Sequence, residues 1–352
     1  MIKRAIKIGW PFIAGLLVFC GTTFAGHHPL FIEKYYSEGL YPFIAAVFSF
    51  FSRLIPFSLW EVFWMVSLSF LVITLILVLI RKLKLWFFLL RFFQILAIIY
   101  SFFYLSWGFN YFRPKIEKRS GWNTPKPDDA NFREVFDTII SKTNKSYSIL
   151  VHSDYKDIDL LVEKSFRKNA PAFGIKYPTG YRVPKKMIFS SLFAKSGVSG
   201  YFGPFFNEVH VNRYLLPMEY PFVLAHEKAH QFGITEEAEA NLAAYIICSS
   251  SDDRRLQYSG NVQLLSYFLS DAHRLQDRNQ YVQKIDSLVA LDILCERKHW
   301  HNLENKTFDN VQTAANNFYL KTNRIHDGVN NYNRVVSLVI SWYLNQKKDS
   351  AK

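Results

Sequence analysis

The sequence predicts three membrane-spanning helices at the amino-terminal end, followed by a mainly helical α+β domain with a small sheet. Half of the 352 residues are hydrophobic, and the long apolar runs all lie in the first third of the chain. The remainder is polar and has helical periodicity, interrupted by one region rich in Tyr, Phe, Val and Gly. This uneven distribution indicates a membrane region joined to a water-soluble domain.

Three runs are long and apolar enough to cross about 30 Å of hydrocarbon as helices. They cover about residues 8–25, 59–80 and 85–107 and define a membrane domain of residues 1–108. The short link 81–84 carries three basic residues, as does the segment before the first run. Because short basic segments stay in the cytoplasm, we expect a cytoplasmic amino terminus and an extracytoplasmic location for everything after the third span.

Three further segments complete the predicted organisation. Residues 38–57 are mostly apolar but too short to cross again, so we expect them at the outer membrane surface. Residues 109–127 are rich in Pro, Lys and Gly, which predicts a linker. Residues 128–352 should form the extracytoplasmic domain, with helices near 130–143 and 158–169, short strands between 177 and 214, and helices thereafter.

The charge and the cysteines limit the classes of partner. The net charge of +13 could indicate binding to nucleic acid. The polar part of the chain, however, has no stripe of basic residues interleaved with aromatic residues, which nucleic-acid binding would favour. Attraction to anionic lipid headgroups explains part of the charge, so the expected partner is the lipid bilayer and not nucleic acid. Cys20 should lie in lipid, and Cys248 and Cys295 are expected as two buried thiols, with a disulfide between them as the alternative.

The strongest chemical signal is His226-Glu227-Lys228-Ala229-His230. Residues four apart share a helix face, so the imidazoles of His226 and His230 can hold one cation. Glu227 falls beside that cation, where its carboxylate can accept a proton from water. Two surface histidines on an ordinary helix are the alternative, but the flanking residues are apolar, and buried histidines are costly without a partner. Lys228 is expected to point outward.

A catalytic zinc ion takes three protein ligands and keeps one position for water. Gly233 permits a turn, after which Glu236, Glu237 and Glu239 open the next helix. Glu237 is preferred because it shares a helix face with Asn241, which can orient a ligand histidine. Glu236 is the main rival, since its spacing from the motif matches the third ligand of metzincins, and Glu239 is a further alternative. The acidic cluster could also simply complement the helix macrodipole.

The same residues resemble a known family. The motif through Gln231, with Glu237, Glu239, Ala240, Asn241 and Tyr245, resembles the domain-of-unknown-function 3810 family, membrane proteins with zincin-like signatures. The likeness covers nearly the whole chain and includes the three spans, Pro56-Phe57-Ser58-Leu59, Gly200-Tyr201-Phe202 with Pro204, and Tyr319-Leu320-Lys321. The spacing of Glu237 and Asn241 is also similar to the gluzincins, many of which carry Asp at the second position. The resemblance implies a zincin-like metallopeptidase fold.

The expected activity is hydrolysis of a peptide bond in an envelope or other extracytoplasmic protein or peptide. One Zn²⁺ would be held by His226, His230 and Glu237, with Glu227 as general base for a zinc-bound water. The expected location is the bacterial inner (cytoplasmic) membrane. The alternative is a non-catalytic zinc-binding scaffold or sensor of the envelope. Glu227 favours the enzyme, because a structural zinc site has no use for an unligated carboxylate.

Two further sets of residues complete the expected site. The tetrahedral oxyanion needs a donor, for which the candidates are Tyr332, His326 and Tyr245. An extended substrate can pair with the edge of a sheet, and the expected edge strand runs to Asn212 through Phe205, Phe206, Asn207, Glu208 and Val209.

Overall fold

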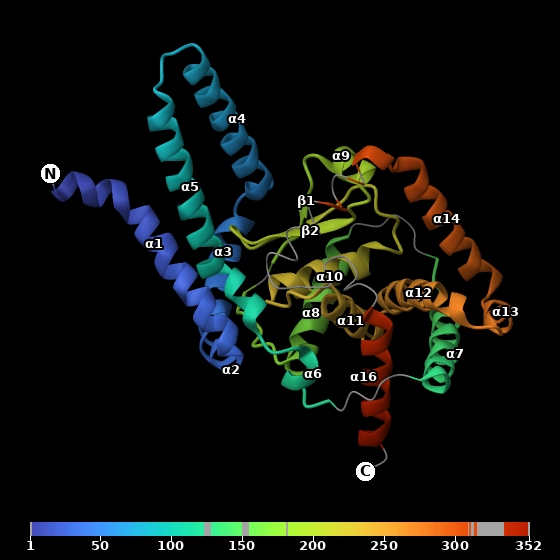
Figure 1. The fold of residues 1–352 in the computed structure, drawn as a ribbon. Helices are drawn as coiled ribbons and strands as arrows, with labels where there is room; N and C mark the ends of the chain where they lie inside the picture. The colour runs from blue at the N-terminus through green and yellow to red at the C-terminus, as the bar shows by residue number, and fades with distance from the viewer. Residues whose placement is uncertain are drawn as a thin grey trace. The chain divides into compact units, whose positions relative to one another are not determined.

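The computed structural model describes residues 2–122, 128–149, 155–180, 182–308, 310, 313–314 and 334–350. These residues form many helices and one three-stranded sheet (Figure 1), which confirms the predicted mainly helical α+β character. The chain divides into two compact units. We call the first the membrane unit, and it comprises Met1–Pro114, Pro178–Gly180 and Gly203–Glu208. We call the second the site unit, and it comprises Lys115–Tyr177, Tyr181–Phe202 and Val209–Lys352.

The membrane unit contains three helices long and apolar enough to cross a membrane, as predicted. They are α1 (Ile2–His27), α4 (Leu59–Leu79) and α5 (Leu85–Ser106). Helix α1 packs along α5, and α4 and α5 form a pair closed by a tight link (Figure 1). The connection from α1 to α4 contains α2 (Pro29–Phe31), the π-helix η1 (Ile32–Leu40) and α3 (Tyr41–Arg53), and α5 is followed by η2 (Gly108–Phe112).

A short turn from the later part of the chain is also part of the membrane unit. The ring of Phe205 packs against Trp60, Phe63 and Phe102, with centroid distances of 5.0, 5.3 and 5.6 Å. The Glu208 carboxylate accepts hydrogen bonds from the Trp60 amide, at 3.0 Å, and from the Ser52 hydroxyl, at 2.8 Å. A carboxylate is favoured at this place because the first amides of a helix lack partners within the helix.

The site unit is built mainly from helices. α7 (Asp129–Ser146) and α8 (Lys156–Asn169) confirm the two helices predicted after the linker. The others are α6 (Ile116–Arg119), η3 (Ala170–Phe173), α9 (Ser190–Lys195), α10 (Tyr220–Gln231), α11 (Glu237–Ser249), α12 (Arg254–Asp271), η4 (Ala272–Arg274), α13 (Arg278–Val282), α14 (Ser287–Leu303) and α16 (Val335–Ser350).

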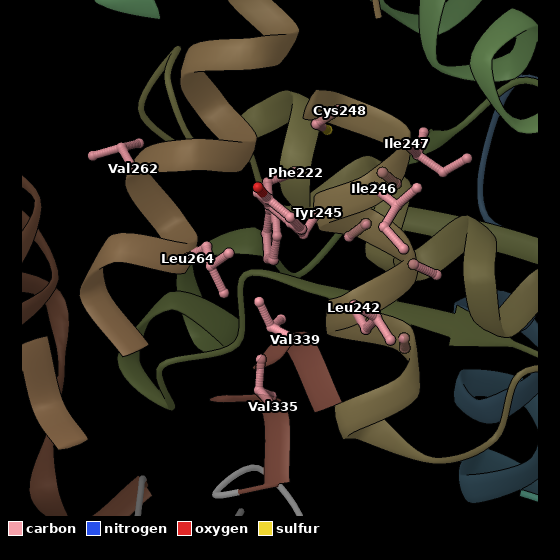
Figure 2. Packing of buried hydrophobic residues seen from close by; sticks show 14 of the residues in the cluster. Phe222, Leu242, Tyr245, Ile246, Ile247, Cys248, Val262, Leu264, Val335 and Val339 are labelled. Atoms are coloured by element: carbon pink, nitrogen blue, oxygen red, sulfur yellow. The ribbon is translucent and has the colours of Figure 1, made fainter. Parts of the chain in front are cut away.

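Helix α11 lies at the centre of the hydrophobic core. Its apolar side chains pack against α10, α12 and α16, and Figure 2 shows Tyr245 and Leu242 among residues of these helices. Helices α11 and α12 approach each other closely at Gly260 of α12, where only glycine fits. A Cβ at this position would lie 2.7 Å from the Cβ of Cys248 on α11. Cys248 is buried as expected, whereas Cys295 is exposed on α14, and the two thiols are unpaired. The hydrophobic effect of this burial holds the second helix of the predicted motif in place.

The described part of the segment predicted as a linker, residues 109–122, includes residues that pack into the structure. Lys115 begins the site unit, and Ile116 is fully buried. The Ile116 amide donates to Glu239 Oε1 at 2.9 Å, and Arg119 donates to Glu239 Oε2 at 2.5 Å. Arg119, one of the polar residues on which the linker prediction was based, therefore forms a buried ion pair and is not exposed to water.

The sheet has the order β1-β3-β2, from β1 (Lys185–Lys186), β3 (Glu208–Val211) and β2 (Gly200–Gly203). β1 runs parallel to β3, with Lys185 opposite His210. The predicted edge strand is therefore placed differently: β3 is central, and Phe205, Phe206 and Asn207 belong to the turn before it. Val209 is buried in the core and Glu208 contacts the first turn of α4. Within the described residues, β2 is an edge strand of this sheet.

Candidate metal centre

The candidate site lies on two consecutive helices of the site unit, α10 and α11, which pack against each other. Pro221 stands in the first turn of α10, where its missing amide hydrogen is tolerated. Gly233 adopts a left-handed conformation with φ of 87° just after the helix, a conformation that favours glycine. The chain thereby reverses within five residues and brings Glu237 back to the histidines.

Three side-chain atoms converge at this point. His226 Nε2 lies 3.1 Å from His230 Nε2 and 3.2 Å from Glu237 Oε2, and His230 Nε2 lies 3.5 Å from Glu237 Oε2. A tetrahedral zinc ion with bonds of about 2.0–2.1 Å separates its ligand atoms by about 3.3–3.4 Å. The three atoms therefore fit one ion, and they are the one such group of His, Cys, Asp or Glu found among the described residues.

The neighbouring glutamates are directed elsewhere. Glu236 pairs with Arg334, and Glu239 pairs with Arg119. Of the three glutamates considered from the sequence, Glu237 is the one whose carboxylate reaches both imidazoles.

Both imidazoles are oriented by their other ring nitrogen. His226 Nδ1 lies 2.9 Å from Asn241 Oδ1, and His230 Nδ1 lies 2.8 Å from the Ile234 carbonyl oxygen. Both partners are acceptors, so each Nδ1 donates a hydrogen, and a neutral ring then presents the lone pair of its Nε2 to the centre of the cluster. Asn241 thus occupies the orienting position expected from the sequence.

The electrostatics of the cluster favour a positive charge at its centre. Burial opposes ionisation of Glu237, but His230 and His226 outweigh it and hold the pKa of Glu237 well below its usual range. Burial likewise opposes the charged form of His230, yet the Glu237 carboxylate raises the pKa of His230 to about 9. The Glu237 carboxylate therefore stabilises positive charge at the centre of the cluster.

Glu227 lies beside the cluster and is not among the converging atoms. Burial raises the pKa of Glu227 to about 7, against the opposing effect of the two histidines. A Cβ on Gly200 of strand β2 would lie 2.8 Å from Glu227 Cγ and Oε1, so only glycine leaves this carboxylate its space. The edge strand β2 therefore passes directly over the carboxylate.

Lys228 points into the protein, which corrects the expectation that it faces outward. It is fully buried, and its Nζ donates to Glu163 Oε2 at 2.5 Å and to the Arg182 carbonyl at 3.0 Å. Arg182 donates to the other oxygen of Glu163 at 2.7 Å and lies over the Phe232 ring. Two cations therefore share one buried carboxylate behind the motif, an arrangement that the spacing of the motif does not reveal.

Of the three predicted oxyanion donors, the structure describes one, Tyr245. Tyr245 is a core residue whose hydroxyl lies 2.5 Å from that of Tyr343, and Tyr332 and His326 lie outside the described residues. Tyr267 of α12 is a residue that the sequence did not single out: burial, and then the neighbouring Glu237 carboxylate, raise its pKa. It stands 30 residues beyond Glu237 with no motif around it, so no local signal could have indicated it.

The fold and the cluster together define a protein with three membrane-length helices and a His-His-Glu centre. A family model described as a protein of unknown function (DUF3810) matches residues 36–340, so the chain belongs to this family. Searches of curated proteins and of solved structures gave no match.

Proposed function

We propose that this protein is a membrane-anchored, zinc-dependent metallopeptidase. The observation that carries the proposal is the convergence of His226, His230 and Glu237 to between 3.1 and 3.5 Å, with a second carboxylate, Glu227, beside them. A structural zinc site has no need of that second carboxylate, whereas hydrolysis needs a base next to the ion.

In the proposed reaction, His226, His230 and Glu237 would hold one Zn²⁺, which would supply Lewis-acid activation of water and of the substrate carbonyl. Glu227 accepts the proton of the attacking water and passes it to the leaving amine. Burial favours the protonated form of Glu227, so this side chain can pass on the proton that it has accepted. Asn241 and the Ile234 carbonyl keep the imidazoles in the tautomer that presents Nε2.

The substrate backbone is proposed to pass beside Gly200, because the close approach of Gly200 to Glu227 places the start of β2 next to the cluster. The basic link between α4 and α5 supports a cytoplasmic amino terminus and a site unit on the opposite side of a bacterial inner membrane.

The test combines metal analysis with cleavage of a random peptide library by the purified full-length protein and by Glu227→Gln. We expect one zinc ion per chain in both proteins and cleavage at least 10²-fold slower in the variant, since a general base contributes about 10²–10⁴-fold. Zinc in both proteins with no cleavage by either would support a zinc-binding scaffold or sensor instead. Equal cleavage by both would remove Glu227 from the mechanism.

A further inference from the structure

The side chain that orients His226 is an amide, and an amide can be turned in two ways. His226 Nδ1 donates to Asn241 Oδ1 at 2.9 Å. A carboxylate offers an acceptor oxygen on both sides, whereas an amide has one acceptor side and one donor side. If the Asn241 amide were reversed, its NH2 group would face the N–H group of His226, and the hydrogen bond would be lost. A second contact must therefore hold the amide in the productive orientation.

Helix α12 places one side chain on the other side of this amide. α12 packs along α11 (Figure 1), and a four-residue connection joins the two helices, so they run antiparallel. They meet closely where a Cβ on Gly260 would lie 2.7 Å from the Cβ of Cys248. Asn241 lies seven residues before Cys248, and Tyr267 lies seven residues after Gly260. Seven residues make about two helical turns, so Tyr267 of α12 stands opposite Asn241 of α11.

The Tyr267 hydroxyl faces the donor side of the amide. Burial, and then the Glu237 carboxylate, raise the pKa of Tyr267, whereas a hydrogen-bonding interaction with Asn241 lowers it. An amide lowers the pKa of a phenol when its N–H group points at the phenol oxygen, because that arrangement favours the ionised form. No acceptor among the described residues has the ideal distance and angle to the buried Asn241 Nδ2, so the contact with Tyr267 is long or bent. Loss of this contact would leave a buried N–H group unsatisfied by any described residue, which is unfavourable.

We infer that Tyr267 is a positioning residue of the metal centre, whose hydroxyl holds the Asn241 amide in the orientation that lets His226 present Nε2 to a metal ion. This inference rests on the proposed zinc site and not on the peptidase reaction. Tyr267 acts through Asn241 and supplies no ligand atom. Without its hydroxyl, the reversed amide becomes accessible, and its NH2 group favours the imidazole tautomer that carries the hydrogen on Nε2. An Nε2 atom that carries a hydrogen does not bind zinc, so the metal affinity falls.

The test measures the zinc affinity of the purified full-length protein in detergent by competition with a chromogenic chelator. Tyr267→Phe removes the hydroxyl and keeps the ring, and we expect it to lower the zinc affinity about 10–100-fold, as for other residues that orient a ligand histidine. The matched control is Tyr258→Phe on the same helix, because the Tyr258 hydroxyl donates to Asp292 of α14. This control should keep the wild-type affinity. Equal losses in both variants would make the effect one of helix packing and overturn the inference.

A second comparison separates orientation from packing. Asn241→Asp presents an acceptor oxygen to His226 whichever way the side chain is turned. Adding Tyr267→Phe to Asn241→Asp should therefore lower the zinc affinity far less than Tyr267→Phe does in the wild type. The same loss in both backgrounds, or no loss with Tyr267→Phe alone, overturns the positioning role and leaves the zinc site intact. A wild-type protein that binds no zinc overturns both this inference and the proposed function.

Discussion

At the scale of single residues, the identity of the third ligand has the sharpest test. Glu237 reaches both imidazoles, whereas Glu236 is paired with Arg334. Removing an orienting residue lowers metal affinity about 10–100-fold, and removal of a ligand should exceed that range. We therefore expect Glu237→Ala to lose zinc affinity by more than about 100-fold and Glu236→Ala by less than about tenfold. Competition with a chromogenic chelator measures both, and the reverse order would make Glu236 the ligand.

The buried charge of Lys228 leads to a prediction about stability. Removing one partner of a buried ion pair costs about 3–5 kcal/mol. Because Arg182 still neutralises Glu163 after Lys228→Met, we expect a loss near the lower end of this range. The matched control is Lys284→Met, which breaks an exposed pair with Asp137 and should cost far less, because water screens an exposed ion pair. Chemical unfolding in detergent measures the free energy of unfolding of both variants. Equal losses in the two variants would contradict the assignment of Lys228 to a buried ion pair.

The residues of the cluster could be predicted because they are close in sequence. His226 to Asn241 occupy 16 positions on two helices, and the helical repeat places His226 with His230 on one face of the first helix and Glu237 with Asn241 on one face of the second. Lys228 shows the limit of this reasoning. Its partner Glu163 is 65 positions away, so nothing local distinguishes a lysine that faces water from one that completes a buried ion pair.

At the scale of secondary-structure elements, the passage of β2 over Glu227 leads to a prediction about activity. A methyl group at position 200 would lie 2.8 Å from Glu227 and 2.9 Å from Val223, well inside normal contact distance. Gly200→Ala should therefore displace Glu227 and slow peptide cleavage at least tenfold, with zinc content unchanged. Gly9→Ala is the control, since a Cβ there meets nothing within 4 Å. Unchanged cleavage by Gly200→Ala would contradict the arrangement.

The order of the strands in the sheet could not be predicted from the sequence. Strand β1 consists of two lysines, which have neither the alternation nor the β-branched residues that indicate a strand. Without β1, the strand formed around Val209 looks like the end of the sheet, although it is the middle. Phe205 adds to the difficulty, because an aromatic residue favours a strand but here fills a space among the rings of α4 and α5.

At the scale of the whole site unit, a buried pair of carboxyl groups predicts how stability depends on pH. Glu219 precedes α10 and accepts hydrogen bonds from the Leu216 amide, at 2.7 Å, and from Trp300 of α14, at 2.5 Å. Burial, reinforced by the neighbouring Glu296, raises the pKa of Glu219 to about 8. A carboxyl whose pKa is higher in the folded state binds its proton more tightly there. Its contribution to stability is therefore complete below about pH 4 and is lost as the pH rises through about 8.

Glu219→Gln removes this titration while keeping an oxygen that accepts a hydrogen bond. We expect its stability to change less between pH 4.5 and 8 than that of the wild type, by at most about 1.4 kcal/mol per pH unit. Thermal melting in detergent across this range measures the slope. Glu134→Gln, at an exposed pair with Lys347, should keep the wild-type slope. A wild-type slope in Glu219→Gln would mean that another group titrates.

The membrane helices could be predicted from composition, because an apolar run of about twenty residues is rarely anything other than a membrane span. The predicted spans 59–80 and 85–107 end within one residue of α4 and α5. Composition could not show that the turn 203–208 joins the membrane unit, because Phe205 and Phe206 give no sign in the sequence of where they pack.

The hydrogen bonds from Ile116 and Arg119 to Glu239 decide where a soluble fragment of this protein should begin. A fragment starting at Asp128, the boundary suggested by composition, lacks both donors and leaves a buried carboxylate two residues from Glu237 without them. A fragment starting at Lys115 retains them, together with the Glu117 partner of Arg334. The thirteen residues that separate these two starting points determine whether the isolated fragment keeps the ion pair between Arg119 and Glu239, two residues along the chain from Glu237.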